Sequence, residues 1–170
     1  MLRWSLKMRR SIITKRGQME IRYTEQGDIT ALKDILDQVE LFPSEMLEAM
    51  LTGFLAGDTD DLWLTLENEC TAIGFCYANP EQMTQDTWNI LALAVSPKHQ
   101  GGGAGAQLTL QMEAQIEDQG GRIIIVDTSG TDAFAKTRKF YEKTGYTEEA
   151  RIRDFWSKGD DKVTFRKALF

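Results

Sequence analysis

The fold is decided by residues 94–105, which read Ala94-Val95-Ser96-Pro97-Lys98-His99-Gln100-Gly101-Gly102-Gly103-Ala104-Gly105. This stretch joins an apolar segment, residues 88–95, to an amphipathic segment that ends near residue 119. Glycines let successive backbone N–H groups turn toward one concavity, and the first turn of a helix adds partial positive charge there. Four glycines among six residues therefore predict a cradle for a pyrophosphate. A flexible strand–helix turn is the alternative, although one or two glycines would serve for that.

Two common phosphate-binding motifs do not fit this loop. A nucleoside-triphosphate P-loop ends in Gly-Lys-Ser/Thr, whereas Ala106 and Gln107 follow Gly105 here. A dinucleotide fingerprint would follow the first strand of a βαβ unit, but this loop lies in the middle of the chain. The phosphate ligand is therefore of another kind.

The regions on either side of the loop predict one α/β (α+β) domain over residues 19–170. Alternating apolar residues predict strands, and apolar residues three or four apart predict helices. The expected order is βααβββαβαββ, with a mixed, mostly antiparallel central sheet flanked by helices. The strands are expected at 19–23, 62–66, 71–77, 88–95, 122–127, 146–151 and 162–167, and the helices at 28–39, 43–55, 105–119 and 132–144.

Charge is unevenly distributed along the chain. Residues 1–18 form a basic N-terminal extension with six bases and no acid, so the rest carries −12 where the whole chain carries −6. This extension is either an arm for an anionic surface or an upstream addition, since Met8 and Met19 are alternative starts. Because the domain repels phosphate backbones, we expect no nucleic-acid partner, and its acidity favours cationic ligands.

Several other classes of protein do not fit the composition. The longest apolar run, residues 90–95, is far shorter than the roughly 20 residues of a membrane helix, so we expect no membrane partner. With two cysteines, Cys70 and Cys76, and the single histidine His99, we expect neither a disulfide framework nor a metal site. The same cysteine usage favours the reducing cytoplasm.

Two motifs at the proper separation resemble the GNAT superfamily of N-acetyltransferases. Residues 100–105 fit its Gln/Arg-x-x-Gly-x-Gly/Ala signature position by position, after a strand end, 93–97, that also resembles the family. Residues 140–146, Phe-Tyr-Glu-Lys-Thr-Gly-Tyr, resemble its Phe-Tyr-x-Lys-x-Gly-Phe/Tyr motif. The resemblance covers residues 19–168.

The resemblance implies acetyl-CoA as cosubstrate and a direct transfer of its acetyl group to an amine. The acceptor would be a primary amine of a small molecule, protein or peptide, and the protein a monomer or homodimer. A non-catalytic acyl-CoA-binding sensor or scaffold is the alternative. The residues implicated in cofactor binding are Leu93 and Val95, which would pair with the pantetheine arm, and Gln100, Gly101, Gly102, Gly103, Ala104 and Gly105, which would bind the pyrophosphate. Tyr141 would be the general acid that protonates the CoA thiolate, unless it only packs in the core.

The catalytic base is left open by the sequence. Many members of the family carry a glutamate on the central strand, but residues 89–93 contain no acid. Asp154, Asp160 and Asp161 are candidates, beside water held by backbone carbonyls. Trp63, Trp88 and Trp156 could line a pocket for a cationic acceptor or could be packing residues.

Overall fold

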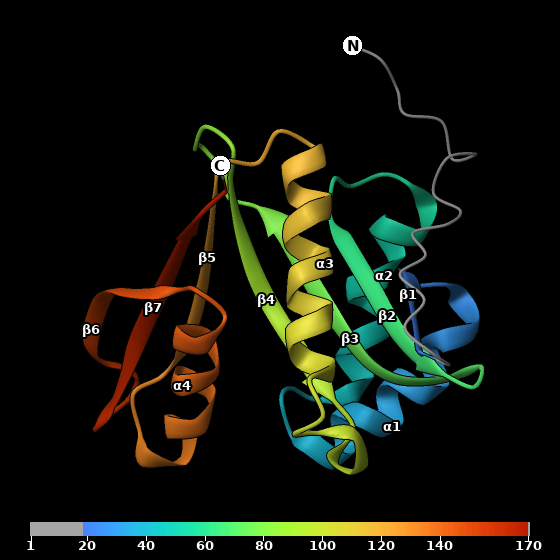
Figure 1. The fold of residues 1–170 in the computed structure, drawn as a ribbon, viewed down its shortest axis with the longest axis horizontal. Helices are drawn as coiled ribbons and strands as arrows, with labels where there is room; N and C mark the ends of the chain where they lie inside the picture. The colour runs from blue at the N-terminus through green and yellow to red at the C-terminus, as the bar shows by residue number, and fades with distance from the viewer. Residues whose placement is uncertain (1–18, 170) are drawn as a thin grey trace. The chain divides into compact units, whose positions relative to one another are not determined.

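The computed structural model describes residues 19–169, so the predicted N-terminal extension, residues 1–18, lies outside the described residues. The helices and strands follow the predicted order βααβββαβαββ (Figure 1). The helices are α1 (Ile29–Val39), α2 (Leu47–Ala56), α3 (Ala104–Asp118) and α4 (Ala135–Lys143). The strands are β1 (Met19–Tyr23), β2 (Leu62–Asn68), β3 (Thr71–Pro80), β4 (Thr87–Val95), β5 (Ile123–Ser129), β6 (Thr147–Ser157) and β7 (Asp160–Ala168).

The strands form one seven-stranded sheet in the order β1-β2-β3-β4-β5-β7-β6. The β4–β5 pair is parallel, whereas the β1–β2, β2–β3, β5–β7 and β6–β7 pairs are antiparallel. This confirms the predicted α/β domain with a mixed, mostly antiparallel sheet. Backbone contacts divide the described chain into two compact units, residues 19–79 with 92–112 and residues 80–91 with 113–169. We call these, in this order, the first unit and the second unit.

Three helices begin with a 3-10 turn that the sequence does not reveal. These turns are Gln26–Asp28 before α1, Ser44–Met46 before α2 and Asp132–Phe134 before α4. Apolar periodicity alone predicts one continuous helix in each case. The 3-10 turn before α2 also leaves Met46 49% exposed, although helical spacing predicts it on the apolar face.

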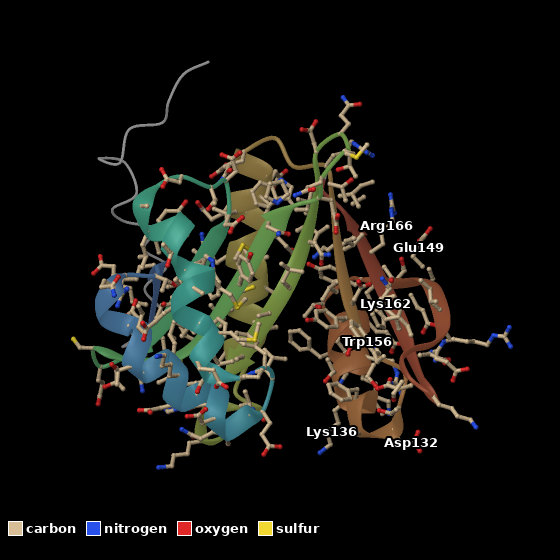
Figure 2. All side chains as sticks on the ribbon, turned by 180° about the vertical axis from the view of Figure 1, so that it is seen from behind. Asp132, Lys136, Glu149, Trp156, Lys162 and Arg166 are labelled. Carbon is tan, nitrogen blue, oxygen red and sulfur yellow. The ribbon has the colours of Figure 1, made fainter. Side chains whose placement is uncertain are left out.

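In the first unit, α1 and α2 cover one face of β2 and β3, and the first half of α3 covers the other (Figures 1 and 2). Alternation along the strands explains this arrangement. Trp63, Phe75 and Tyr77 belong to the hydrophobic cluster of α1 and α2, while Gly74 approaches Leu108 of α3. Trp63 and Tyr77 stack with ring centroids 4.0 Å apart.

Asp28 has a different role from the helix N-cap that the sequence predicts. It precedes α1, but its side chain makes no capping hydrogen bond there. Both carboxylate oxygens instead accept hydrogen bonds of 2.8 Å from Arg22, and Oδ2 also accepts one from the Glu25 N–H. Arg22 pairs with Glu67 of β2 as well. Asp28 therefore caps the 3-10 turn before α1, through the Glu25 N–H, rather than α1 itself, while Arg22 ties β1 to β2.

We expect Asp28→Asn to lower the free energy of unfolding at pH 7 by about 2–3 kcal/mol, because it breaks a charged pair that is largely buried. Burial alone would raise the pKa of Asp28, but the hydrogen bonds and charge of Arg22 and the Glu25 N–H outweigh it and hold the pKa below its usual 3.8. A depressed pKa contributes stability that is complete above pH 3.8 and is lost as the pH falls further.

Urea denaturation of the wild type and Asp28→Asn, at pH 7 and again at the lowest pH at which both fold, measures this effect. The difference between the two proteins should shrink below pH 3.8. The matched control is Glu48→Gln, which disrupts the exposed pair with Lys33 and should cost less than about 0.5 kcal/mol. A difference between wild type and Asp28→Asn that stays constant with pH would show that the charge pair contributes nothing.

In the second unit, one face of the strands packs against helices. Trp88 of β4 lies beside Ile116 and Gly121, and Phe165 of β7 contacts the Tyr141 ring of α4 at 5.7 Å. The unbroken apolar run at residues 123–126 predicts a strand buried on both faces, and this prediction is wrong. Ile124 and Val126 are buried, but Ile123 and Ile125 are only half-buried, so a single face of β5 enters the core.

At two places where the sequence predicts that a strand ends, the strand continues. β3 runs through Asn79 to Pro80, where the sequence predicts its end. β6 and β7 extend to Ser157 and from Asp160, so the predicted polar loop is a tight hairpin with a register shift between Ile152 and Ser157. Hydrogen bonds of Asp154 and Asp161, described below, account for this extension.

The β2–β3 turn holds two side chains in a backbone conformation that favours glycine. Glu69 and Cys70 have φ angles of 50° and 64°, between the paired residues Asn68 and Thr71. Such two-residue turns favour Asn-Gly, because a side chain at positive φ costs about 1 kcal/mol or more. We therefore expect Glu69→Asn with Cys70→Gly to raise the free energy of unfolding by about 1 kcal/mol.

Chemical denaturation measures this gain. Glu69→Gln serves as the control, because it removes the charge but brings no preference for positive φ, and it should leave stability unchanged. No gain in the double variant would contradict the explanation.

Candidate functional site

The glycine loop of the first unit connects the end of β4 to the start of α3. A 3-10 turn, Pro97–His99, follows β4, and α3 begins at Ala104. Gly101 and Gly103 have φ angles of 81° and 89°, which side chains rarely adopt. No atom lies within 4 Å of a Cβ placed at Gly101, Gly102 or Gly103. The loop thus combines the required backbone freedom with open space beside the N-terminus of a helix, as an anion cradle needs.

Two side-chain hydrogen bonds fix the entry to this loop. Gln100 Nε2 donates to the carbonyl oxygen of Val95 at 2.8 Å. Ser96 Oγ and His99 Nδ1 lie 2.7 Å apart, and the Ser96 N–H donates to Ile73 of β3. The Gln100 side chain therefore fixes the end of β4 next to the loop. His99 likewise stabilises the 3-10 turn.

Leu93 and Val95 lie on the last part of β4, directly before the loop. Val95 is 8% exposed and Leu93 is half-buried. The parallel pairing of β4 with β5 covers Thr87–Ile90, so both residues come after the last of these pairs. Gly74 allows β3 to approach here, since a Cβ at this position would lie 2.8 Å from the carbonyl oxygen of Ala94. The first unit brings the predicted cofactor residues of β4 and the loop together on one strand–loop–helix segment.

Tyr141 lies in the second unit, on α4, and is 5% exposed. Its ring contacts those of Phe140, Tyr146 and Phe165, with centroids 5.1, 5.6 and 5.7 Å away. Its carbonyl oxygen accepts hydrogen bonds from the N–H groups of Thr144 and Tyr146. Packing on three sides fixes the orientation of this phenol.

The three candidate bases of the β6–β7 hairpin all make hydrogen bonds that shape it. Asp154, at φ 52°, accepts a bond of 2.6 Å from the Gly159 N–H. Asp161 accepts one of 3.0 Å from the Asp154 N–H, and Asp160 accepts one of 2.6 Å from Ser129 Oγ. These contacts explain the three acids as structural residues, and we assign none of them as the base.

The three tryptophans occupy different environments. Trp63 and Trp88 are 0% and 5% exposed, so their packing role accounts for them. Trp156, labelled in Figure 2, is 51% exposed on β6, with its ring against that of Phe155. Of these three, Trp156 alone presents its ring to solvent.

Sequence reasoning missed a carboxyl–phenol pair in the first unit. Tyr77 of β3 donates a hydrogen bond of 3.3 Å to Asp61, which directly precedes β2. Burial raises the pKa of Asp61 above its usual 3.8. Burial and the neighbouring carboxylate raise the pKa of Tyr77 to about 12. Tyr77 is therefore a hydrogen-bond donor throughout the neutral range. The strand register places the two residues together, and the sequence alone does not give that register.

Residues 19–169 contain no group of three or more His, Cys, Asp or Glu side chains arranged to hold a metal ion. Within the same residues, no helix has the length and apolar character that a membrane span requires.

Comparison with known proteins identifies the class. The sequence model of the acetyltransferase (GNAT) family matches residues 29–146. Because this match covers more than half of the chain, the protein belongs to the GNAT acetyltransferase family. Among curated protein sequences, none matched the chain.

Solved structures with the same fold include several acetyltransferases. A GNAT-family protein from Desulfovibrio desulfuricans is 23% identical, with a TM-score of 0.82 over 89% of this chain and 99% of that one. The ribosomal-protein-S18-alanine N-acetyltransferase of Escherichia coli is 20% identical, with a TM-score of 0.74 over 89% and 94%. An acetyltransferase of Salmonella typhimurium, solved with acetyl-CoA, is 16% identical, with a TM-score of 0.73 over 91% and 95%. At these identities the likeness shows the GNAT fold.

Proposed function

We propose that the protein is an acetyl-CoA-dependent N-acetyltransferase that moves the acetyl group directly to a primary amine of a small molecule, protein or peptide. The observation that carries this proposal is the glycine loop, with Gly101 and Gly103 at positive φ before α3. Further support comes from two similar structures, of which one holds coenzyme A and the other acetyl-CoA.

The cofactor would be held mainly by backbone groups. The N–H groups of residues 101–105 would bind the pyrophosphate, where the first turn of α3 adds partial positive charge. Leu93 and Val95 would pair with the amides of the pantetheine arm as a neighbouring strand does. Backbone dipoles thus let a chain with a formal charge of −6 bind an anionic cofactor.

The reaction needs two proton transfers. An alkyl amine with a pKa near 10.4 must lose a proton, which costs roughly 4–5 kcal/mol at pH 7. Its lone pair then forms the C–N bond as the C–S bond breaks, and CoA leaves as a thiolate. We assign the protonation of that thiolate to Tyr141. Cys70 and Cys76, the cysteines of the described residues, form no disulfide bond, which fits our proposal that the enzyme works in a reducing cytoplasm.

The test is to incubate purified protein with acetyl-CoA and a panel of diamines, aromatic amines and short peptides with free N-termini. Free thiol is recorded continuously, and acetylated product is identified by mass spectrometry. Amine-dependent thiol release with an acetylated product supports the proposal.

The same samples also test the alternative of a non-catalytic acyl-CoA-binding module, which the absence of an acid at residues 89–93 favours. A rise in melting temperature with acetyl-CoA, but no thiol release, would support that module. No rise with either acetyl-CoA or CoA would overturn both proposals.

A further inference from the structure

The second unit contains a buried side-chain amide, that of Asn89, whose NH₂ group binds a carboxylate. The oxygen of the same amide has no hydrogen-bond partner among the described residues. Asn89 of β4 is 8% exposed and donates from Nδ2 to Oε1 of Glu81 at 2.8 Å. Its Oδ1 is fully buried and accepts no hydrogen bond from any residue that the structure describes. Leaving a buried amide oxygen unpaired is costly, so a ligand with an N–H or O–H group would be stabilised there.

Glu81 is held against Asn89 by the backbone as well. It directly follows β3, and its N–H donates to the carbonyl oxygen of Thr87 on β4 at 2.8 Å. Its carboxylate forms no ion pair within residues 19–169, and its side chain is only half-buried. A cation can therefore approach the Glu81 carboxylate from solvent.

The chemistry of these two groups suits a primary ammonium. It carries three N–H donors, enough to bond both the Glu81 carboxylate and Asn89 Oδ1. A quaternary ammonium has no N–H group and would leave Oδ1 unpaired. Calcium requires six to eight oxygen ligands and magnesium six, whereas this pair offers far fewer.

We propose that Glu81 and Asn89 form the subsite for the amino group of the acetyl acceptor, with Glu81 as the group that takes its proton. This inference rests on the proposed function. Asn89 lies four residues before Leu93 on the same strand, β4. In this role Asn89 accepts a hydrogen bond from the amine through Oδ1 and, through Nδ2, keeps the Glu81 carboxylate in place.

The step balances as follows. The ammonium gives one proton to a Glu81 oxygen, and the freed lone pair attacks the thioester carbonyl. The C–N bond forms, the C–S bond breaks, and the thiolate takes a proton from its acid. The second N–H proton of the attacking nitrogen is lost to water, and Glu81 returns its own proton to water before the next turnover. The acid regains a proton from water, so each turnover releases one proton in all.

Binding of the amino group is tested without turnover. Methylammonium is titrated into the ¹⁵N-labelled full chain, and the Asn89 side-chain NH₂ signal is followed by NMR. We expect a saturable shift with methylammonium, no shift with tetramethylammonium, and loss of the shift in Glu81→Gln. Equal shifts with both cations, or none with methylammonium, would overturn the subsite.

Proton transfer is tested with the amine that gives the fastest turnover in the panel. Glu81→Gln should lower kcat/KM at least 100-fold, Glu81→Asp should recover part of it, and the dissociation constant for acetyl-CoA should not change. The matched control, Glu117→Gln on the exposed side of α3, should keep wild-type activity. Wild-type kcat/KM in Glu81→Gln would overturn the role of Glu81.

The two proposals fail in different ways. If methylammonium binds as expected but no amine in the panel is acetylated, the proposed function fails and the amine subsite stands. If amines are acetylated but Glu81→Gln has no effect, the proposed function stands and this inference fails.

Discussion

Replacing both Gly101 and Gly103 with alanine is expected to raise the dissociation constant for acetyl-CoA by about 30- to 700-fold. Both glycines have positive φ, where each added side chain costs about 1–2 kcal/mol. No atom lies within 4 Å of either new Cβ, so the cost comes from the backbone rather than from a clash. The loop would relax to negative φ and turn its N–H groups away from the phosphates. About 1.4 kcal/mol corresponds to a tenfold change in affinity, which sets the expected range.

Isothermal titration with acetyl-CoA measures this effect, and two single variants control for its causes. Gly102→Ala adds a methyl group at a position without the left-handed φ, and should change affinity much less. Gly159→Ala adds the same backbone strain, at φ 85°, in the β6–β7 turn, where it should lower stability but leave affinity unchanged. Equal weakening in Gly159→Ala, or wild-type affinity in the double variant, would show that the loop geometry does not bind the cofactor.

The order of helices and strands could be predicted because it depends on local periodicity. Alternating apolar residues place β1 from residue 19, and the loop at 100–105 marks where β4 ends and α3 begins. Both signals are contained in a few consecutive residues, so neither needs knowledge of distant partners. The residues of the glycine loop could be named for the same reason, since a backbone site requires glycine and little else.

The misassigned residues are those whose side chains bond a group outside their own helix or turn, which local periodicity does not reveal. Asp28 directly precedes α1, as an N-cap does, but its carboxylate pairs with Arg22 of β1, which in turn pairs with Glu67 of β2. The β6–β7 hairpin is similar, because Asp154 and Asp161 bond each other's segments and extend strands that turn residues would end.

The candidate site also depends on a side-chain contact that local sequence patterns do not reveal. Because no acid occurs at residues 89–93, the sequence suggests the acids of a later loop as candidates for the base. The carboxylate that bonds this part of β4 is that of Glu81, eight residues before Asn89, which reaches the strand because β3 and β4 are neighbours in the sheet. A side-chain contact across two strands has no signature in composition or spacing.

The second large effect is expected in Tyr141→Phe, which should lower kcat about 100-fold or more, because a positioned general acid typically contributes that much. The dissociation constant for acetyl-CoA should be unchanged, since the cofactor is assigned to the backbone of β4 and the loop. Stability should change little, because the phenyl ring can keep the contacts with Phe140, Tyr146 and Phe165.

Tyr146→Phe separates a chemical role of Tyr141 from a structural one. The two rings are neighbours, 5.6 Å apart, and both are buried, but the Tyr146 hydroxyl donates to the buried Glu113 carboxylate at 2.9 Å. Its loss should therefore cost about 1–3 kcal/mol of stability and leave kcat unchanged, the reverse of the expectation for Tyr141→Phe. Steady-state kinetics and urea denaturation of both variants decide the matter. If Tyr141→Phe keeps the wild-type kcat, or loses stability as Tyr146→Phe does while retaining its rate, Tyr141 is a packing residue and the thiolate takes its proton from another donor.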